Sequence, residues 1–78
     1  MEISACNQLP GVIKSIKSGA ILSEVVIATG DNEITAVITR GSADHLNLKE
    51  GDLVYAVVKA TEVIVAKPSP TDTTPEFA

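Results

Sequence analysis

Apolar and polar residues alternate along most of the first 66 positions, and short turn motifs divide them into segments. The alternation around Val12, Ile13 and Ile16 predicts a partly exposed first strand, which we expect to begin at Ser4 and to end at Ser18-Gly19. The β-branched run at residues 20–28 predicts a second strand, and residues 33–39 predict a third. Residues 29–32 are rich in turn formers and separate these two strands.

The next segment, residues 41–47, interrupts the strand pattern. We expect Ser42 to be the N-cap of a short helix, because its hydroxyl can accept from an exposed backbone N–H. A second turn at residues 49–52 leads to strands at 53–59 and 62–66, bent near Ala60-Thr61. Five strands with one helical turn between the third and fourth predict an all-β fold, a small OB-like five-stranded Greek-key barrel that is partly open.

The strand that starts at Leu53 is apolar on both faces, with Val54, Ala56 and Val58 on one and Leu53, Tyr55 and Val57 on the other. Either the core has two tight layers, or a second subunit covers the outer face; we favour the subunit interface. The chain has 78 residues, 45% of them apolar, and a single cysteine. A domain this small that cannot form an intrachain disulfide is expected to gain stability from association.

Residues 1–66 are predicted to form the one domain, followed by a tail at residues 67–78. Three prolines interleave with serine and threonine in the tail, so we expect it to be disordered or extended. Phe77 either docks on a neighbouring subunit or has no role, and we favour a tail without a role. No secretory signal or membrane-spanning run is expected, and one free thiol suits a reducing compartment, so the predicted location is the cytoplasm.

Charge and composition narrow the function classes. The formal net charge of −4 and the aromatic content of 3% argue against an OB-type nucleic-acid binder, which needs cations and stacking platforms. The only histidine, His45, is expected on a solvated surface, and we predict no enzyme activity. Hydrogen-bond donors that suit a tetrahedral oxyanion remain, at Ser4, Thr39, Ser42 and Lys59. Structural explanations that involve no ligand remain open for these residues. The side chain of Lys59 can extend into water, and Ser42 can serve only as a helix cap.

Four blocks in order carry a resemblance to a known family: Ile3-Ser4-Ala5 followed by Asn7-Gln8-Leu9, then residues 34–39, 48–52 and 56–63. The chain resembles the molbindins, small molybdate-binding proteins built on the Mop or TOBE domain. The resemblance implies a homo-hexamer of OB-like subunits, a trimer of dimers, that binds molybdate or tungstate at subunit interfaces for storage or homeostasis.

The resemblance also implies which residues bind. Ser4, Ala5 and Cys6 of one subunit would meet Thr39, Ser42, Lys59 and Ala60 of another, with Lys59 supplying charge and the two alanines backbone N–H groups. Gly19 and Ala20 are candidates for a second site on a threefold axis. Cys6 stands where the family usually has arginine, which removes a charged donor fork. The alternative function is therefore an assembly or regulatory interaction module of the same fold that has lost its ligand.

Overall fold

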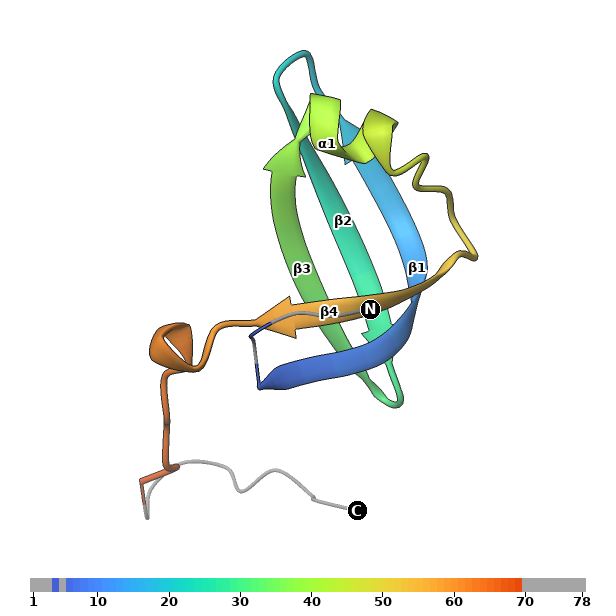
Figure 1. Ribbon diagram of the computed structural model, residues 1–78. Helices are drawn as coiled ribbons and strands as arrows, with labels where there is room; N and C mark the ends of the chain where they lie inside the picture. The colour runs from blue at the N-terminus through green and yellow to red at the C-terminus, as the bar shows by residue number, and fades with distance from the viewer. Residues whose placement is uncertain (1–3, 5, 70–78) are drawn as a thin grey trace.

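The fold is a curved antiparallel sheet with one short helix across one end (Figure 1). The computed structural model describes Ser4 and residues 6–69. Its elements are the strands and helices β1 (Asn7–Ser18), β2 (Leu22–Thr29), β3 (Asn32–Thr39), α1 (Arg40–His45), β4 (Leu53–Val58) and the 3₁₀ turn η1 (Ala60–Glu62). The strand order β3-β2-β1-β4 is that of a Greek key, because the fourth strand returns to lie beside the first.

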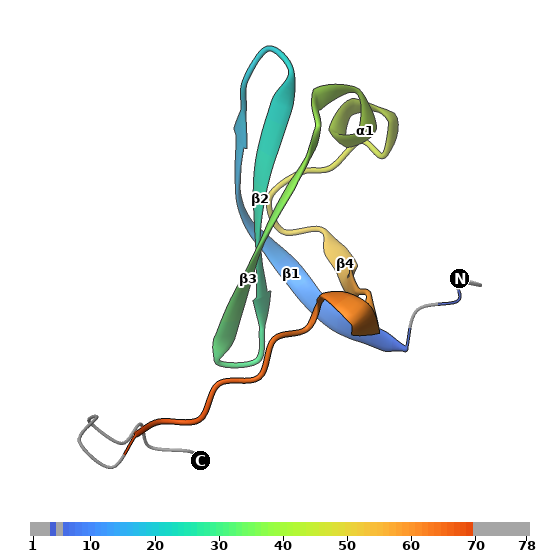
Figure 2. The ribbon, with the colours of Figure 1, turned by 90° about the vertical axis from the view of Figure 1, so that its left-hand side faces the viewer.

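This architecture confirms an all-β fold with a helical turn between the third and fourth strands, but the described residues hold four strands and not five. Residues 63–69 have no regular structure, so the strand expected at 62–66 is not formed. Figures 1 and 2 both show the chain leaving the sheet after η1. A strand needs a neighbouring edge for its backbone hydrogen bonds, and within the described residues this segment pairs with neither edge of the sheet.

The long strand β1 joins the two halves of the sheet. Its first half, from Asn7 to Val12, pairs with β4, and its second half, from Val12 to Ser18, pairs with β2. A bulge between Ile13 and Ser15 shifts the register and sharpens the twist. Gly11 lies at the change of partner, where a Cβ would be 2.6 Å from the carbonyl oxygen of Ala28. Glycine is therefore required for the close approach that bends the sheet into a half-barrel.

The core lies on the concave side of this half-barrel. Ile13, Val25, Ile27 and Ala56 are each at most 6% exposed. Partly buried apolar side chains from β1, β3 and β4 and from the loop before β4 surround them: Ile16, Ile34, Ala36, Ile38, Leu48 and Val54. Since successive side chains of a strand alternate, the other face of β4 points outward, and its Leu53 is 85% exposed. The two-faced apolar pattern of this strand is thus confirmed.

The turns and the helix follow local chemistry. Gly30 and Gly51 have positive φ angles of 61° and 89°, which confirms the two predicted turns. The expected N-cap was wrong: Thr39, not Ser42, caps α1, because the Thr39 hydroxyl accepts from the Ser42 N–H at 3.1 Å. The last residue of β3 is also the helix cap, so the chain passes from strand to helix without a loop. Buried Ala43 packs α1 against the sheet.

Candidate functional site

One group of predicted site residues lies at the shared end of β1 and β4. The ladder between these strands finishes at the pair Asn7 and Val58, so Cys6 and Lys59 are the next residue on each strand. Both are exposed. Ser4 is an exposed bend residue two positions before Cys6 and does not belong to β1, which begins later than expected. Ala5 lies outside the described residues.

Lys59 and Ala60 open the η1 turn directly after this ladder. The carbonyl of Lys59 accepts from the Glu62 N–H at 2.9 Å, which closes the turn. The first N–H groups of a helical turn have no partner inside the turn. The backbone N–H of Ala60 is therefore placed to donate outward, beside the exposed Lys59. This end of the molecule, the β4 end, offers one cation, one backbone donor and one thiol.

The second group lies at the opposite end of the sheet, the α1 end. Thr39 and Ser42 share a hydroxyl–hydroxyl hydrogen bond of 2.8 Å, in addition to the cap bond. One bond between two hydroxyls uses one proton, so the pair keeps one O–H that can donate to a ligand. An open hollow of about 500 Å³ adjoins them and is lined by Thr39, Gly41, Ser42, His45 and Leu46.

The second-site candidates Gly19 and Ala20 form the exposed loop between β1 and β2, and this loop also lies at the α1 end. The carbonyl of Gly19 accepts from the Arg40 guanidinium at 3.1 Å. The backbone N–H of Arg40 donates to the carbonyl of Ile21 at 2.7 Å. The structure therefore brings the loop next to Thr39 and Ser42.

Arg40 is a functional candidate that the sequence reasoning missed. It is the only arginine of the chain and stands between Thr39 and Ser42 in the sequence. Its side chain is 48% exposed and lies 3.6 Å from the carboxylate of Asp44. Arginine presents a planar fork of N–H donors that fits an oxyanion. A lone arginine between two hydroxyl residues is the signal that would have identified it.

The two groups cannot meet within one chain. Cys6 and Lys59 lie at the start of β1, whereas Thr39 pairs with Leu22 beyond the end of β1. The 12 residues of β1 separate the two ends, and an extended strand rises about 3.3 Å per residue, so the ends lie several times farther apart than the width of a single oxyanion. An oxyanion that contacts both groups must therefore lie between two copies, with the β4 end of one against the α1 end of another.

Within Ser4 and residues 6–69, no three His, Cys, Asp or Glu side chains cluster so as to hold a metal ion. In the same part of the chain, no helix is long and apolar enough to cross a membrane.

Comparison with known proteins places this geometry in a family. The sequence pattern of the TOBE domain matches residues 3–65. The chain belongs to the TOBE domain family. This TOBE protein is 44% identical over 66 residues to molybdenum-pterin-binding protein 1 of Clostridium pasteurianum, which covers 83% of this chain and 97% of that protein.

Solved structures agree with the fold. A molybdate-binding protein from Sporomusa ovata superposes with a TM-score of 0.82 at 40% identity, over 86% of this TOBE chain and all of that chain. The cytoplasmic molybdate-binding protein ModG, in a form with molybdate bound, superposes with a TM-score of 0.81 at 39% identity. That match covers 87% of this chain and 49% of ModG. The OB-like fold class is thus confirmed on both sequence and structure.

Proposed function

We propose that this TOBE protein binds molybdate, and that the binding serves storage or homeostasis of the oxyanion and not catalysis. The observation that carries the proposal is the likeness to proteins named for molybdate binding, one of them with molybdate bound, over 86–87% of the chain. Tungstate is a tetrahedral dianion of the same kind, and the same donors suit it. The cytoplasm is the proposed location, which agrees with the description of ModG as cytoplasmic.

The proposed site lies between subunits. Ser4, Ala5, Cys6, Lys59 and Ala60, from the β4 end of one copy, would converge on the anion with Thr39 and Ser42, from the α1 end of another, and Gly19 and Ala20 would form a second site. This division differs from the expected one, in which Lys59 and Ala60 shared a subunit with Thr39 and Ser42, because the ladder of β1 and β4 places Lys59 beside Cys6 of the same chain. Because the β4 end and the α1 end are separated by the length of β1, at least two copies are needed to bring all these donors together. We extend the α1 group by Arg40, which lies beside Gly19.

A homo-oligomer, proposed as a hexamer built from three dimers, suits the surface of the chain. Twelve large apolar side chains of the described residues are exposed, among them Leu53 at 85% and Ile21 at 76%. So much exposed apolar surface on a small domain marks contact with other proteins. The domain is proposed to span residues 1–66, with a tail at 67–78; residues 70–78, including Phe77, lie outside the described part.

The alternative is an assembly or regulatory module that has lost its ligand. Cys6 favours it, because a thiol in place of a charged guanidinium removes a donor that would hold a dianion. Both functions predict the same oligomer, and only the first predicts a response to molybdate.

Equilibrium dialysis separates the two. The purified protein is dialysed against molybdate and, in parallel, against sulfate, and bound metal is counted per subunit while light scattering gives the mass. Retained molybdenum on an oligomer is the expected result. An oligomer without retained molybdenum would establish the ligand-free module, and a monomer without it would exclude both proposals.

A further inference from the structure

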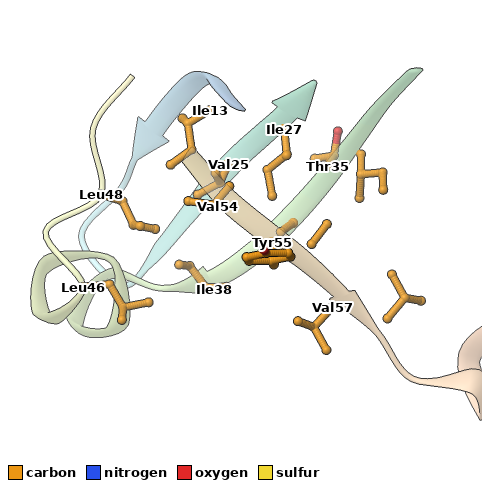
Figure 3. Close-up of a pocket in the computed structure, with 14 residues that line it drawn as sticks. Ile13, Val25, Ile27, Thr35, Ile38, Leu46, Leu48, Val54, Tyr55 and Val57 are labelled. Carbon is orange, nitrogen blue, oxygen red and sulfur yellow. The ribbon is translucent and has the colours of Figure 1, made fainter. Parts of the chain in front are cut away.

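Leu46, the residue that ends α1, lines two depressions of different character. One is a groove of about 360 Å³ whose walls include β3 and β4 and are almost entirely apolar (Figure 3). The other is the hollow of about 500 Å³ at the α1 end, which two hydroxyl groups and an imidazole line. Of the two, the hollow is the one that offers polar groups to a small anion.

The polar residues of this hollow recur at every third position of the chain, at Thr39, Ser42 and His45. Residues three apart on a helix lie on one face, so these side chains run along the same side of α1. The bonded pair of Thr39 and Ser42 keeps one O–H that can donate. His45 is exposed, and no hydrogen bond or ion pair joins its ring to another of the described residues. Both ring nitrogens are therefore available to a ligand.

The permanent positive charge at the α1 end is already shared with an acid. The Arg40 guanidinium donates to the carbonyl of Gly19 at 3.1 Å and lies 3.6 Å from the carboxylate of Asp44, which offsets part of its charge. The chain as a whole carries a net charge of −4. A second cation at the hollow would therefore strengthen the binding of a dianion.

His45 is the one titratable side chain of the described residues that lines the hollow. α1 packs against β2 and β3. Glu24, the charged residue of β2, alternates with the buried Ser23 and Val25 and so points to the outer face of the sheet. Glu33, the charged residue of β3, pairs with Lys14 at the end of the strand far from α1. The loop after α1 adds three charged residues that do not line the hollow: Lys49, Glu50 and Asp52.

We propose that His45 is a further anion-binding residue of the α1 end, that it contacts the oxyanion as its imidazolium, and that binding therefore takes up a proton from solution. This inference rests on the proposed function and names what regulates the affinity of that site. A neutral imidazole has one donor and one acceptor, whereas the imidazolium has two donors and a positive charge, so the anion stabilises the protonated form. From the other copy, Cys6 and Lys59 would face the same anion.

Binding that takes up a proton becomes stronger as the pH falls. Histidine changes its charge between pH 5 and 8, so we expect the affinity for molybdate to rise about five- to tenfold from pH 8 to pH 6. Molybdate stays a dianion over this range. Titration calorimetry at constant ionic strength measures the affinity. Runs in two buffers with different heats of ionisation measure the proton uptake, which we expect to be about half a proton per anion at pH 7.

Two substitutions of His45 separate its charge from its shape. His45→Gln is polar but carries no charge, so its affinity should vary less than about twofold between pH 8 and 6, without proton uptake. His45→Lys is a cation throughout this range, so at pH 8 it should bind about fivefold more tightly than His45→Gln. Lys49→Gln is the matched control, because it removes a nearby cation that does not line the hollow and should keep the full pH dependence.

Either of two results with these variants would overturn the proposal. One is a His45→Gln variant that keeps the full pH dependence, and the other is a His45→Lys variant that binds no more tightly than His45→Gln at pH 8.

NMR of the unsubstituted protein gives a test that does not depend on variants. His45 is the only histidine of the chain, so its ring protons report its protonation directly. The midpoint of its titration should move to higher pH when molybdate is added, and less so with sulfate. An unchanged midpoint in protein that retains molybdate would remove the role of His45 and leave the proposed function standing. Protein that retains no molybdate at any of these pH values would remove both.

Discussion

At position 6, a cysteine lies one residue beyond the last pair of the β1–β4 ladder, level with Lys59 on the neighbouring strand. A thiol is one weak donor, whereas a guanidinium is a permanently charged fork of several donors. Lys59 is therefore the side chain that supplies positive charge at the β4 end. The strength of the proposed site depends on how much of the missing charge this lysine replaces.

Replacing Cys6 by arginine should strengthen molybdate binding. A charge-assisted hydrogen bond is worth ~1.5–3 kcal/mol, which corresponds to roughly a tenfold to hundredfold gain in affinity. Titration calorimetry at fixed ionic strength measures the change. Cys6→Ser is the matched control, because it keeps a small neutral side chain and should leave the affinity within about threefold. If Cys6→Arg folds and binds molybdate no better than the control, position 6 does not contact the anion.

At the scale of the elements, the turns could be predicted because local residue types determine them. Features that depend on neighbours distant in the sequence could not be predicted. The turns at Gly30 and Gly51 were foreseen because their residue types determine the backbone angles. The cap was misplaced because Thr39 completes β3 and caps α1 at once, and an alternation pattern assigns it only to the strand. The strand at 62–66 was expected from composition, which shows a preference for a strand but not where a free edge lies.

The site residues divide in the same way, into those that are close in the sequence and those that only the fold brings together. Thr39 and Ser42 are three residues apart, and the structure joins them through two hydrogen bonds. Arg40 gains its importance from the loop at Gly19, which is 21 residues away in the sequence and is brought beside it by the β1–β2 hairpin. Nor does the sequence show that Lys59 and Ser42 lie at opposite ends of the sheet, because that separation follows from the register of β1 with both its neighbours.

The close approach of β1 and β2 at Gly11 predicts that one added methyl group strongly lowers the stability of the fold. In Gly11→Ala, the new Cβ would be 2.6 Å from the Ala28 carbonyl oxygen and 2.7 Å from a methyl of Ile27. Backbone cannot move aside cheaply, so we expect a loss of about 1–3 kcal/mol, as for overpacked cores, measured by urea unfolding.

Gly41→Ala is the matched control for that substitution. Gly41 lies within α1, its φ is not positive, and apart from its chain neighbours and the backbone of its own helix no atom lies within 4 Å of its Cβ position. Alanine in a helix is favoured over glycine by about 0.5–1 kcal/mol, so this variant should be as stable as the unsubstituted protein or more so. Equal losses in both variants would show that the close approach at Gly11 does not limit stability.

At the scale of the whole molecule, association, ligand binding and stability are coupled. Within the described residues, one chain leaves a groove open, exposes twelve large apolar side chains and places the proposed anion donors at two separate ends. Contact between copies would cover the groove and the exposed apolar side chains. It would also bring the β4 end of one copy to the α1 end of another. A ligand that binds only where copies meet must then stabilise the assembly as well as the fold.

Molybdate should therefore raise the melting temperature and shift the equilibrium between subunits and oligomer toward the oligomer. At a free concentration one hundred times the dissociation constant, one site contributes about 2.7 kcal/mol. Calorimetric melting at several protein concentrations, with sedimentation velocity on the same samples, measures both effects. Sulfate at equal ionic strength is the control, because it has the same shape and charge but is smaller than molybdate. It should therefore fit the donors less well and act mainly through general salt effects. If molybdate stabilised dissociated subunits as much as the oligomer, the donors would converge within one chain, and the interface site would be wrong.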